Sequence, residues 1–231
     1  MNVSGVWWKL WTAAWMGLAI VWGFTRVGPA AGFVMDGHAA KIVFFHVPCA
    51  WIATIALVTA AVYAGSYLRQ QQASLLEADF KCAAAMELGF LFALLATVTG
   101  SIFSRLQWNA YWVWNEPRMI SILIVLLIFA AYLVLRGSMD DPYRRARLAS
   151  VYTLVSLVPG IFLIWVLPRI IESLHPNQSF AMGQISAGFR VVMYGMSMPA
   201  FIGLFIWMFQ LRVSLTKLLW RREARLQRVV R

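Results

Sequence analysis

The sequence has few charged residues and very few acidic ones. Of its 231 residues, 13% are charged and only nine are Asp or Glu, whereas 61% are hydrophobic. A soluble domain carries about 25% charged residues, so this chain has too little polar surface to cover a globule in water. The composition predicts that lipid replaces water over much of the surface.

Two motifs of common function classes are also absent, and the cysteines are too few and too far apart for a disulfide framework. The two cysteines, Cys49 and Cys82, fall on different apolar segments near opposite predicted membrane faces, so no structural disulfide is expected between them. The chain lacks a Cys-x-x-Cys-His motif for covalent attachment of a c-type haem. It also lacks the Gly-x-x-x-x-Gly-Lys-Ser/Thr loop that holds ATP phosphates.

Six apolar runs are long enough to cross a bilayer, which takes about 20 residues. They cover residues 7–25, 40–68, 82–103, 119–136, 149–168 and 189–211. Because a backbone in lipid must satisfy its own hydrogen bonds, each run is predicted to be a helix. The first run resembles a signal peptide, but it is rich in tryptophan and has no A-x-A site directly after it, so we expect it to be retained. The predicted fold class is an all-α polytopic membrane protein with six transmembrane helices.

The distribution of lysine and arginine predicts the orientation. The net charge of +11 comes from residues between and after the apolar runs, not from a polar domain that could bind nucleic acid. With both termini in the cytoplasm, most of these residues lie inside, as in other membrane proteins. Residues 1–211 then form the transmembrane domain, and residues 212–231 a basic cytoplasmic tail that lies on anionic lipid or a partner. Three segments face outward: 26–40, 104–118 and 169–188.

The middle outer segment is unusually aromatic, since residues 108–118 read WNAYWVWNEPR. A membrane-interface belt needs one or two tryptophans or tyrosines per helix end, and four in seven positions exceed that need. Were the stretch helical, one face would carry Trp108, Tyr111, Trp112 and Asn115. Trp114 and Arg118 would lie together on another face. An aromatic surface beside a cation suits a flat ligand with carboxylates, such as haem, and the outer arginines that could pair a propionate are Arg105, Arg118, Arg169 and Arg190.

The three histidines all fall on the predicted outer side. His46, in FFHVPCAW, lies about two turns into the second run, where an imidazole indicates either a function or a hydrogen bond to a neighbouring helix. Cys49 follows three residues later, but His-x-x-Cys alone provides too few ligands for a closed copper or zinc site. His38 and His175, the latter in SLHPN, could be ordinary loop residues. Glu87 is the one acid well inside a helix, and we favour an ion pair with a base such as Lys81 over a proton or ligand path.

The stretch 108–118, with His46 in FFHVPCAW and His175 in LHPN, resembles the haem exporter protein C (CcmC) family of cytochrome c maturation. The family's tryptophan-rich segment reads approximately W-G-x-x-W-x-W-D-x-R, and the resemblance covers nearly all the chain. Asn109 replaces the family's glycine. The step from acid to arginine is one residue longer, so either Asn115 or Glu116 replaces the acid.

The resemblance implies a binding and transfer protein, not an enzyme, in the cytoplasmic (inner) membrane of a bacterium or archaeon. It would bind haem b as a transported ligand on the outer face, with His46 and His175 as axial ligands and Arg118 paired to a propionate. The aromatic wall of the site would comprise Trp108, Tyr111, Trp112 and Trp114. Implied partners are ATP-binding-cassette ATPase and membrane subunits, a small single-span subunit and a periplasmic haem chaperone for cytochrome c maturation. The missing phosphate loop fits separate ATPase subunits.

Three alternatives remain open at this level. A related haem lyase would itself join haem to apocytochrome, but such proteins are usually longer. A b-haem electron carrier would place ligand pairs within the membrane, and here only His46 lies in a predicted span. In a structural or transport subunit without a cofactor, the tryptophans would form only a belt.

Overall fold

The computed structural model describes residues 3–26, 38–69, 75–174, 191 and 193–229, and in this part of the chain the regular structure is entirely helical. The elements are α1 (Val3–Thr25), α2 (Ala40–Arg69), α3 (Leu75–Trp108), α4 (Pro117–Gly137), α5 (Pro142–Ile161), the π-helix η1 (Phe162–Val166), α6 (Leu167–Ile170), the π-helix η2 (Met193–Ser197) and α9 (Met198–Val229). The predicted all-α fold class is confirmed.

Five helical stretches in the described residues are long and apolar enough to cross a membrane. They cover residues 40–69, 76–108, 117–137, 142–170 and 193–227. They contain most of the second to sixth predicted runs. The helix α1, which contains the first predicted run, is not one of the five. The six-span topology and the cytoplasmic placement of both termini therefore remain predictions.

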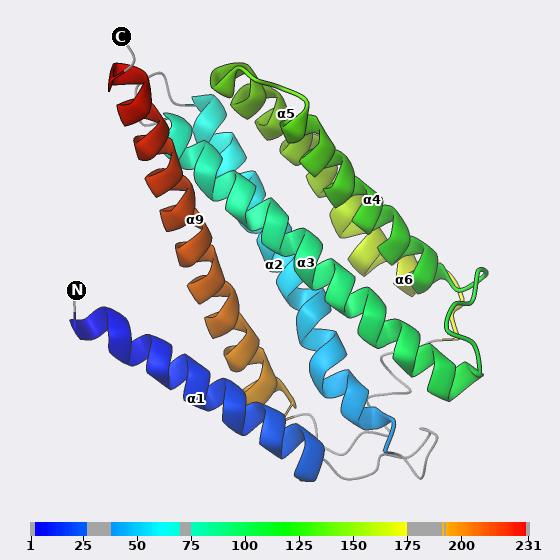
Figure 1. Cartoon of the computed structure of the whole chain (residues 1–231). Helices are drawn as coiled ribbons and strands as arrows, with labels where there is room; N and C mark the ends of the chain where they lie inside the picture. Colours follow the sequence, from blue (N-terminus) through cyan, green and yellow to red (C-terminus); the bar gives the residue numbers. More distant parts are fainter. Residues whose placement is uncertain (1–2, 27–37, 70–74, 175–190, 192, 230–231) are drawn as a thin grey trace.

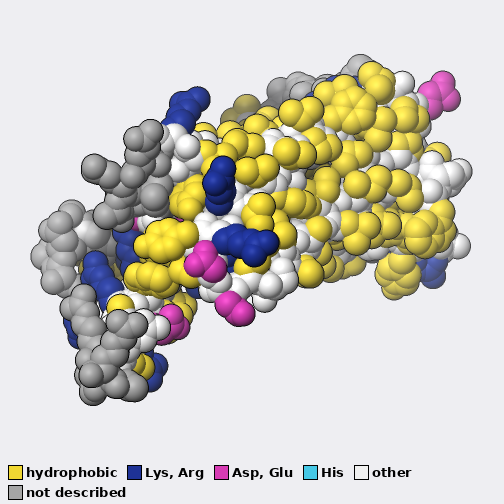
Figure 2. Space-filling model, turned by 90° about the horizontal axis from the view of Figure 1, so that it is seen from above, with side chains coloured by type: hydrophobic (Ala, Val, Ile, Leu, Met, Phe, Trp, Pro, Cys, Tyr) yellow, Lys and Arg dark blue, Asp and Glu magenta, His cyan; other side chains and the backbone are white. Residues whose placement is uncertain are grey.

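The helices α2 and α3 run antiparallel through the centre of the bundle (Figure 1). The helices α4 and α5 lie on one side of this pair, and α9 on the other. The helix α1 packs antiparallel along the first half of α9, where the rings of Trp8 and Trp207 lie 6.4 Å apart. Hydrophobic side chains dominate the face shown in Figure 2, with charged side chains gathered in limited areas.

Small residues let the central helices approach closely. Buried alanines of α2 and α3 belong to one core cluster: Ala53, Ala56, Ala60, Ala64, Ala85, Ala93 and Ala96. Helices in lipid depend on such close packing, because lipid chains are as apolar as the side chains themselves. At Gly89 of α3 a Cβ would lie 2.5 Å from the ring of Phe129, so glycine is needed for α4 to pack there.

Ion pairs join α3 to its neighbours at the end of the bundle away from residues 104–118. Arg136 of α4 makes a two-pronged ion pair with the buried Asp79, with N–O distances of 2.5 and 2.9 Å. Glu87 pairs with Arg212 of α9. An ion pair of Glu87 is thus confirmed, but Lys81 as its partner is wrong, because Lys81 pairs with Glu77 one helical turn away.

The predicted boundary between residues 211 and 212 does not interrupt the chain's regular structure, because α9 runs unbroken from Met198 to Val229. The loop between α3 and α4, the start of α2 and the end of α6 all lie at one end of the bundle (bottom of Figure 1). We call this end the outer end. The described residues that border the three segments predicted to face outward all lie at this end.

Candidate functional site

The tryptophan-rich stretch is a loop between two helices. The helix α3 ends at Trp108, and α4 begins at Pro117. The helical faces considered for residues 108–118 therefore do not apply. Two residues explain the break: Asn109 has a φ of 61°, a left-handed conformation that ends a helix, and Pro117 occupies the first helical position, where proline is favoured.

Asn109 can replace the family's glycine for a conformational reason. A positive φ favours glycine, and asparagine is among the other residues that tolerate it best. The Asn109 side chain also gains a contact, because Nη1 of Arg105 donates to both its backbone oxygen and its Oδ1. The substitution thus keeps the turn and attaches it to α3.

The loop folds back along the outer end of α3. The Ser104 hydroxyl donates to the Ala110 carbonyl at 2.6 Å, and the Ser101 hydroxyl donates to the Tyr111 carbonyl at 2.6 Å. These bonds satisfy two loop carbonyls and hold the loop beside the last two turns of the helix. Ser101 and Ser104 were not predicted as site residues.

His46 packs at the same level of α3. A Cβ placed on Gly100 would lie 3.0 Å from Cε1 of the His46 ring, so the imidazole lies directly against this glycine. His46 and the aromatic loop thus contact neighbouring residues of α3, Gly100 and Ser101 respectively.

A threonine orients the His46 ring. Nδ1 of His46 lies 3.1 Å from Oγ1 of Thr99, and this hydroxyl lies 2.7 Å from the Leu95 carbonyl, to which it donates. Thr99 and the backbone of Ala96 both bond to the His46 ring and so hold its orientation.

Two of the predicted aromatic wall residues contact each other. The rings of Trp112 and Trp114 lie 5.9 Å apart in an edge-to-face arrangement. Trp114 is 72% exposed, whereas Trp112 is half-buried and its Nε1–H is buried without a hydrogen-bond partner among the described residues. This pair presents a broad aromatic surface together with an unsatisfied donor.

The other two aromatic residues lie against α3. Trp108 packs edge-to-face on Phe103 at 5.8 Å, and the Arg105 guanidinium lies 5.7 Å from the centre of the Tyr111 ring. Tyr111 remains 63% exposed. Trp112 and Trp114 thus form a pair, and Trp108 and Tyr111 contact side chains of α3.

The outer arginines differ in their contacts. Arg105 binds Asn109, and Arg169 donates to a carbonyl one turn earlier in its own helical stretch. Arg118 makes no side-chain hydrogen bond or ion pair in the part of the chain that the structure describes, and its Nε is buried. Arg190 lies outside the described residues. Arg118 is thus the outer guanidinium with the clearest capacity to bind an anion.

Glu116 is the buried acid of the site. Its side chain is 1% exposed and caps α4 by accepting the backbone N–H of Arg118 at 3.2 Å. It also accepts the Ser173 hydroxyl and, at 2.8 Å, the backbone N–H of Leu174. Glu116 thus connects the aromatic loop to the segment that follows α6.

The remaining candidates are placed as follows. Asn115 is exposed, whereas Glu116 is the acid that is buried and hydrogen-bonded in the fold. His175 lies outside the described residues, directly after Leu174. His38 is exposed, and Cys49 is buried as a free thiol. Among the described residues no group of three or more His, Cys, Asp or Glu could hold a metal ion, so the His46–Cys49 pair is not extended into a closed site.

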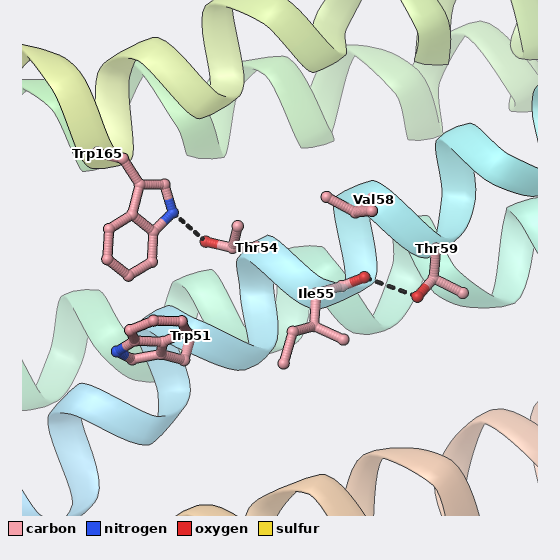
Figure 3. Close-up of a pocket in the computed structure, with 6 residues that line it drawn as sticks. All are labelled: Trp51, Thr54, Ile55, Val58, Thr59 and Trp165. Carbon is pink, nitrogen blue, oxygen red and sulfur yellow. Dashed lines mark hydrogen bonds between the residues drawn. The ribbon is translucent and has the colours of Figure 1, made fainter.

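A separate pocket of about 390 Å³ lies between α2 and η1 (Figure 3). Its lining is almost wholly apolar: Trp51, Thr54, Ile55, Val58, Thr59 and Trp165. The Trp165 indole donates to the Thr54 hydroxyl at 3.0 Å, and the rings of Trp51 and Trp165 lie 4.4 Å apart. Neither the aromatic loop nor His46 lines it, so this pocket is not part of the candidate site.

Fold and site together define a polytopic helical membrane protein in which an aromatic loop and a histidine both pack against the same end of α3. The sequence model of the family "Heme exporter protein C" matches residues 2–230, and the chain belongs to this family.

Individual relatives agree with this assignment. Proteins named Heme exporter protein C are 32% identical in Bradyrhizobium diazoefficiens over 148 residues, 29% in Paracoccus denitrificans over 214 and 29% in Escherichia coli K12 over 158. These matches cover 64%, 90% and 64% of this chain, and 55%, 83% and 61% of the respective relatives. The match thus spans little more than half of the Bradyrhizobium relative's length.

Proposed function

We propose that the protein binds haem b at the outer face of the membrane and passes it on during cytochrome c maturation, without bond chemistry of its own. The observation that carries this proposal is the return of the aromatic loop onto the end of α3 against which His46 packs. A histidine and a wide aromatic surface are the two features that a haem needs from a protein, for its iron and its macrocycle. The family name supports the choice of ligand.

His46 would bind the iron, and Thr99 would help to orient its ring. His175 would bind from the opposite side, as the resemblance implies. Trp112 and Trp114 would wall the macrocycle, with Tyr111 and Trp108 supporting the loop.

Arg118 would pair with a propionate. A buried guanidinium nitrogen without a partner is costly, and a carboxylate would supply both the charge and the acceptor that it lacks. The buried Nε1–H of Trp112 is a second donor that such a ligand could satisfy.

The family also suggests where the haem goes. We propose that the chain acts in the inner membrane as one subunit of a complex with ATP-binding-cassette ATPase and membrane subunits and a small single-span subunit. It would hand haem to a periplasmic chaperone. The family name and the absence of a phosphate-binding loop from this sequence support this placement.

The test is the absorption spectrum of the purified full-length protein, with and without dithionite, from cells supplied with a haem precursor. We expect a Soret band and, after reduction, the sharp α and β bands of a six-coordinate haem. A protein without haem in every preparation would contradict the proposal. A stable haem that cycles with quinol would instead favour the electron carrier.

A further inference from the structure

The pocket between α2 and η1 is open to the surroundings of the bundle. Two of its lining side chains, Trp51 and Val58, are 38% and 43% exposed, so the cavity is not sealed inside the core. The pocket lies between two stretches that are long and apolar enough to cross a membrane, residues 40–69 and 142–170. Lipid rather than water therefore surrounds its mouth.

The walls of the pocket are fixed by their own contacts (Figure 3). The Trp165 indole donates to the Thr54 hydroxyl at 3.0 Å, and this hydroxyl donates to the Ala50 carbonyl at 3.1 Å. The Trp51 ring packs edge-to-face on Trp165. Trp165 belongs to the π-helix η1, and such segments often mark functional sites. The pocket is thus formed by the protein alone, as ligand sites usually are.

The dimensions of the pocket suit a single hydrocarbon chain. Its lining runs along α2 from Trp51 to Thr59, a length of about 12 Å at the α-helical rise of about 1.5 Å per residue. The hydrocarbon of one membrane leaflet is about 15 Å thick, half of the bilayer core. The Thr59 hydroxyl already donates to the Ile55 carbonyl, so the surface left for a ligand is almost wholly apolar.

Two other occupants fit less well. A helix about 10 Å wide would fill about 900 Å³ over this length, whereas the pocket measures about 390 Å³. A haem would find no iron ligand, because the lining contains no His, Cys or Met. A thin apolar chain meets neither difficulty.

A cation lies beside the pocket on the side of the outer end. Arg169 follows Trp165 by one helical turn, and its guanidinium lies 5.2 Å from the centre of the Trp165 ring. Arg169 is exposed, and no carboxylate pairs with it among the residues that the structure describes. A guanidinium at this place is complementary to a phosphate group, which it can bind with two parallel hydrogen bonds.

We infer that this pocket binds one acyl chain of an anionic phospholipid, with the lipid phosphate at Arg169 and the chain extending past Trp51 and Trp165 to Thr59. The lipid belongs to the leaflet at the outer end of the bundle. Neither His46 nor the aromatic loop lines the pocket, so the inference does not depend on the proposed haem function.

Native mass spectrometry of the full-length protein with added phosphatidylglycerol tests the chain site. We expect the first phosphatidylglycerol to bind more tightly than phosphatidylcholine with the same chains. Val58→Trp fills the pocket from an exposed position and should lower the affinity for both lipids by about 10-fold or more, because burial of the chain is lost. Val134→Trp is the matched control, since it makes the same change at an exposed position of α4 outside the pocket.

Equal lipid affinities for Val58→Trp and Val134→Trp would overturn the inference. The haem content of Val58→Trp should equal that of the unaltered protein. A Val58→Trp variant that lost haem but kept phosphatidylglycerol would assign the pocket to haem instead, and the inference would be wrong.

The headgroup contact is tested separately. Arg169→Gln should lower the preference for phosphatidylglycerol over phosphatidylcholine by about 5-fold, as expected for one cation at an anionic lipid surface. Arg26→Gln, which changes an exposed arginine directly after α1, should keep that preference. The same loss in both variants would show that general surface charge attracts the lipid, and the assignment of the phosphate to Arg169 would fail.

A further measurement uses the unaltered protein. Phosphatidylglycerol with a photoreactive diazirine in its acyl chain is crosslinked to the full chain, and the labelled peptides are mapped. We expect labelling to concentrate on residues 51–59 and 162–166. Labelling at the same level along the exposed side of α4, for example at Leu127, would show that the chain has no preferred site and would overturn the inference.

Discussion

The two arginines near the ends of α4 have opposite surroundings. Arg136, in the last turn, makes a two-pronged ion pair with buried Asp79 and lies where the helix dipole favours a cation. Arg118, in the first turn, lies where the dipole disfavours a cation, and its buried Nε has no partner in the described part of the protein. The Arg136 guanidinium is thus paired, whereas Arg118 keeps a buried nitrogen without a hydrogen bond among the described residues, as side chains at functional sites can do.

The same contrast extends along α3. Towards the end of α3 away from residues 104–118, which we call the inner end, acids of α3 bind bases of α4 and α9 through side-chain ion pairs. At its outer end, Ser101 and Ser104 bind only loop carbonyls, and Thr99 orients His46. The inner contacts satisfy one another, whereas the outer contacts position groups that can still bind something else.

The largest effect is expected when the inner ion pair is broken. Asp79→Ala leaves Arg136 buried without its carboxylate, which should destabilise the protein by about 3–5 kcal/mol. Thermal unfolding in detergent should show a large drop in midpoint. The fraction that stays folded should still bind haem with ordinary affinity, because the pair lies far from the aromatic loop. A stability close to that of the unaltered protein would show that this pair does not hold the bundle.

Removing Arg118, the outer arginine, should lower haem affinity without lowering stability. Arg118→Gln should leave the unfolding midpoint close to that of the unaltered protein, because the Arg118 side chain makes no hydrogen bond or ion pair among the described residues. Haem affinity should fall by about 10-fold or more, since hydrogen bonds to charged groups contribute about 1.5–3 kcal/mol. Haem titration measures this affinity. The affinity of Arg118→Lys should lie between those of the unaltered protein and Arg118→Gln, because lysine keeps the charge but loses the planar fork. A lower midpoint with unchanged affinity would make Arg118 a structural residue like Arg136.

The orientation of His46 should affect ligation with little effect on stability. Thr99→Val removes the hydroxyl that bonds to Nδ1 of His46, and the expected loss in haem affinity is about 10-fold. Thr99→Ser keeps the hydroxyl and is the matched control. Equal affinities for the two variants would show that the hydroxyl does not orient the ring.

The smallest effect concerns the turn at Asn109. Asn109→Ala should destabilise the loop by about 1–2 kcal/mol, because alanine tolerates a positive φ poorly. Asn109→Gly should be close to neutral, since glycine adopts the turn freely. The difference in unfolding midpoint between the two variants is the measurement. Equal midpoints for Asn109→Ala and Asn109→Gly would contradict the claim that the positive φ at this position disfavours alanine.

Part of this structure could be predicted from local sequence. Apolar runs predicted the all-helical fold, because a backbone in lipid has few alternatives. Asn109 and Pro117 are local signals for a loop between the third and fourth apolar runs. The side chains that align the site could not be predicted, because Thr99 meets His46 across 53 positions and Glu116 meets Ser173 across 57. Such contacts depend on how the helices pack, and no periodic pattern records them.

The most direct test of the central claim is the ligation state of haem in His46→Gly and His175→Gly. The account predicts a six-coordinate low-spin EPR signal for the unaltered, haem-loaded protein and a high-spin signal for each variant. Imidazole should restore the low-spin signal in both variants by filling the vacated position. Low-spin signals identical to that of the unaltered protein in both variants, without imidazole, would contradict the claim that these two histidines hold the iron beside the aromatic loop.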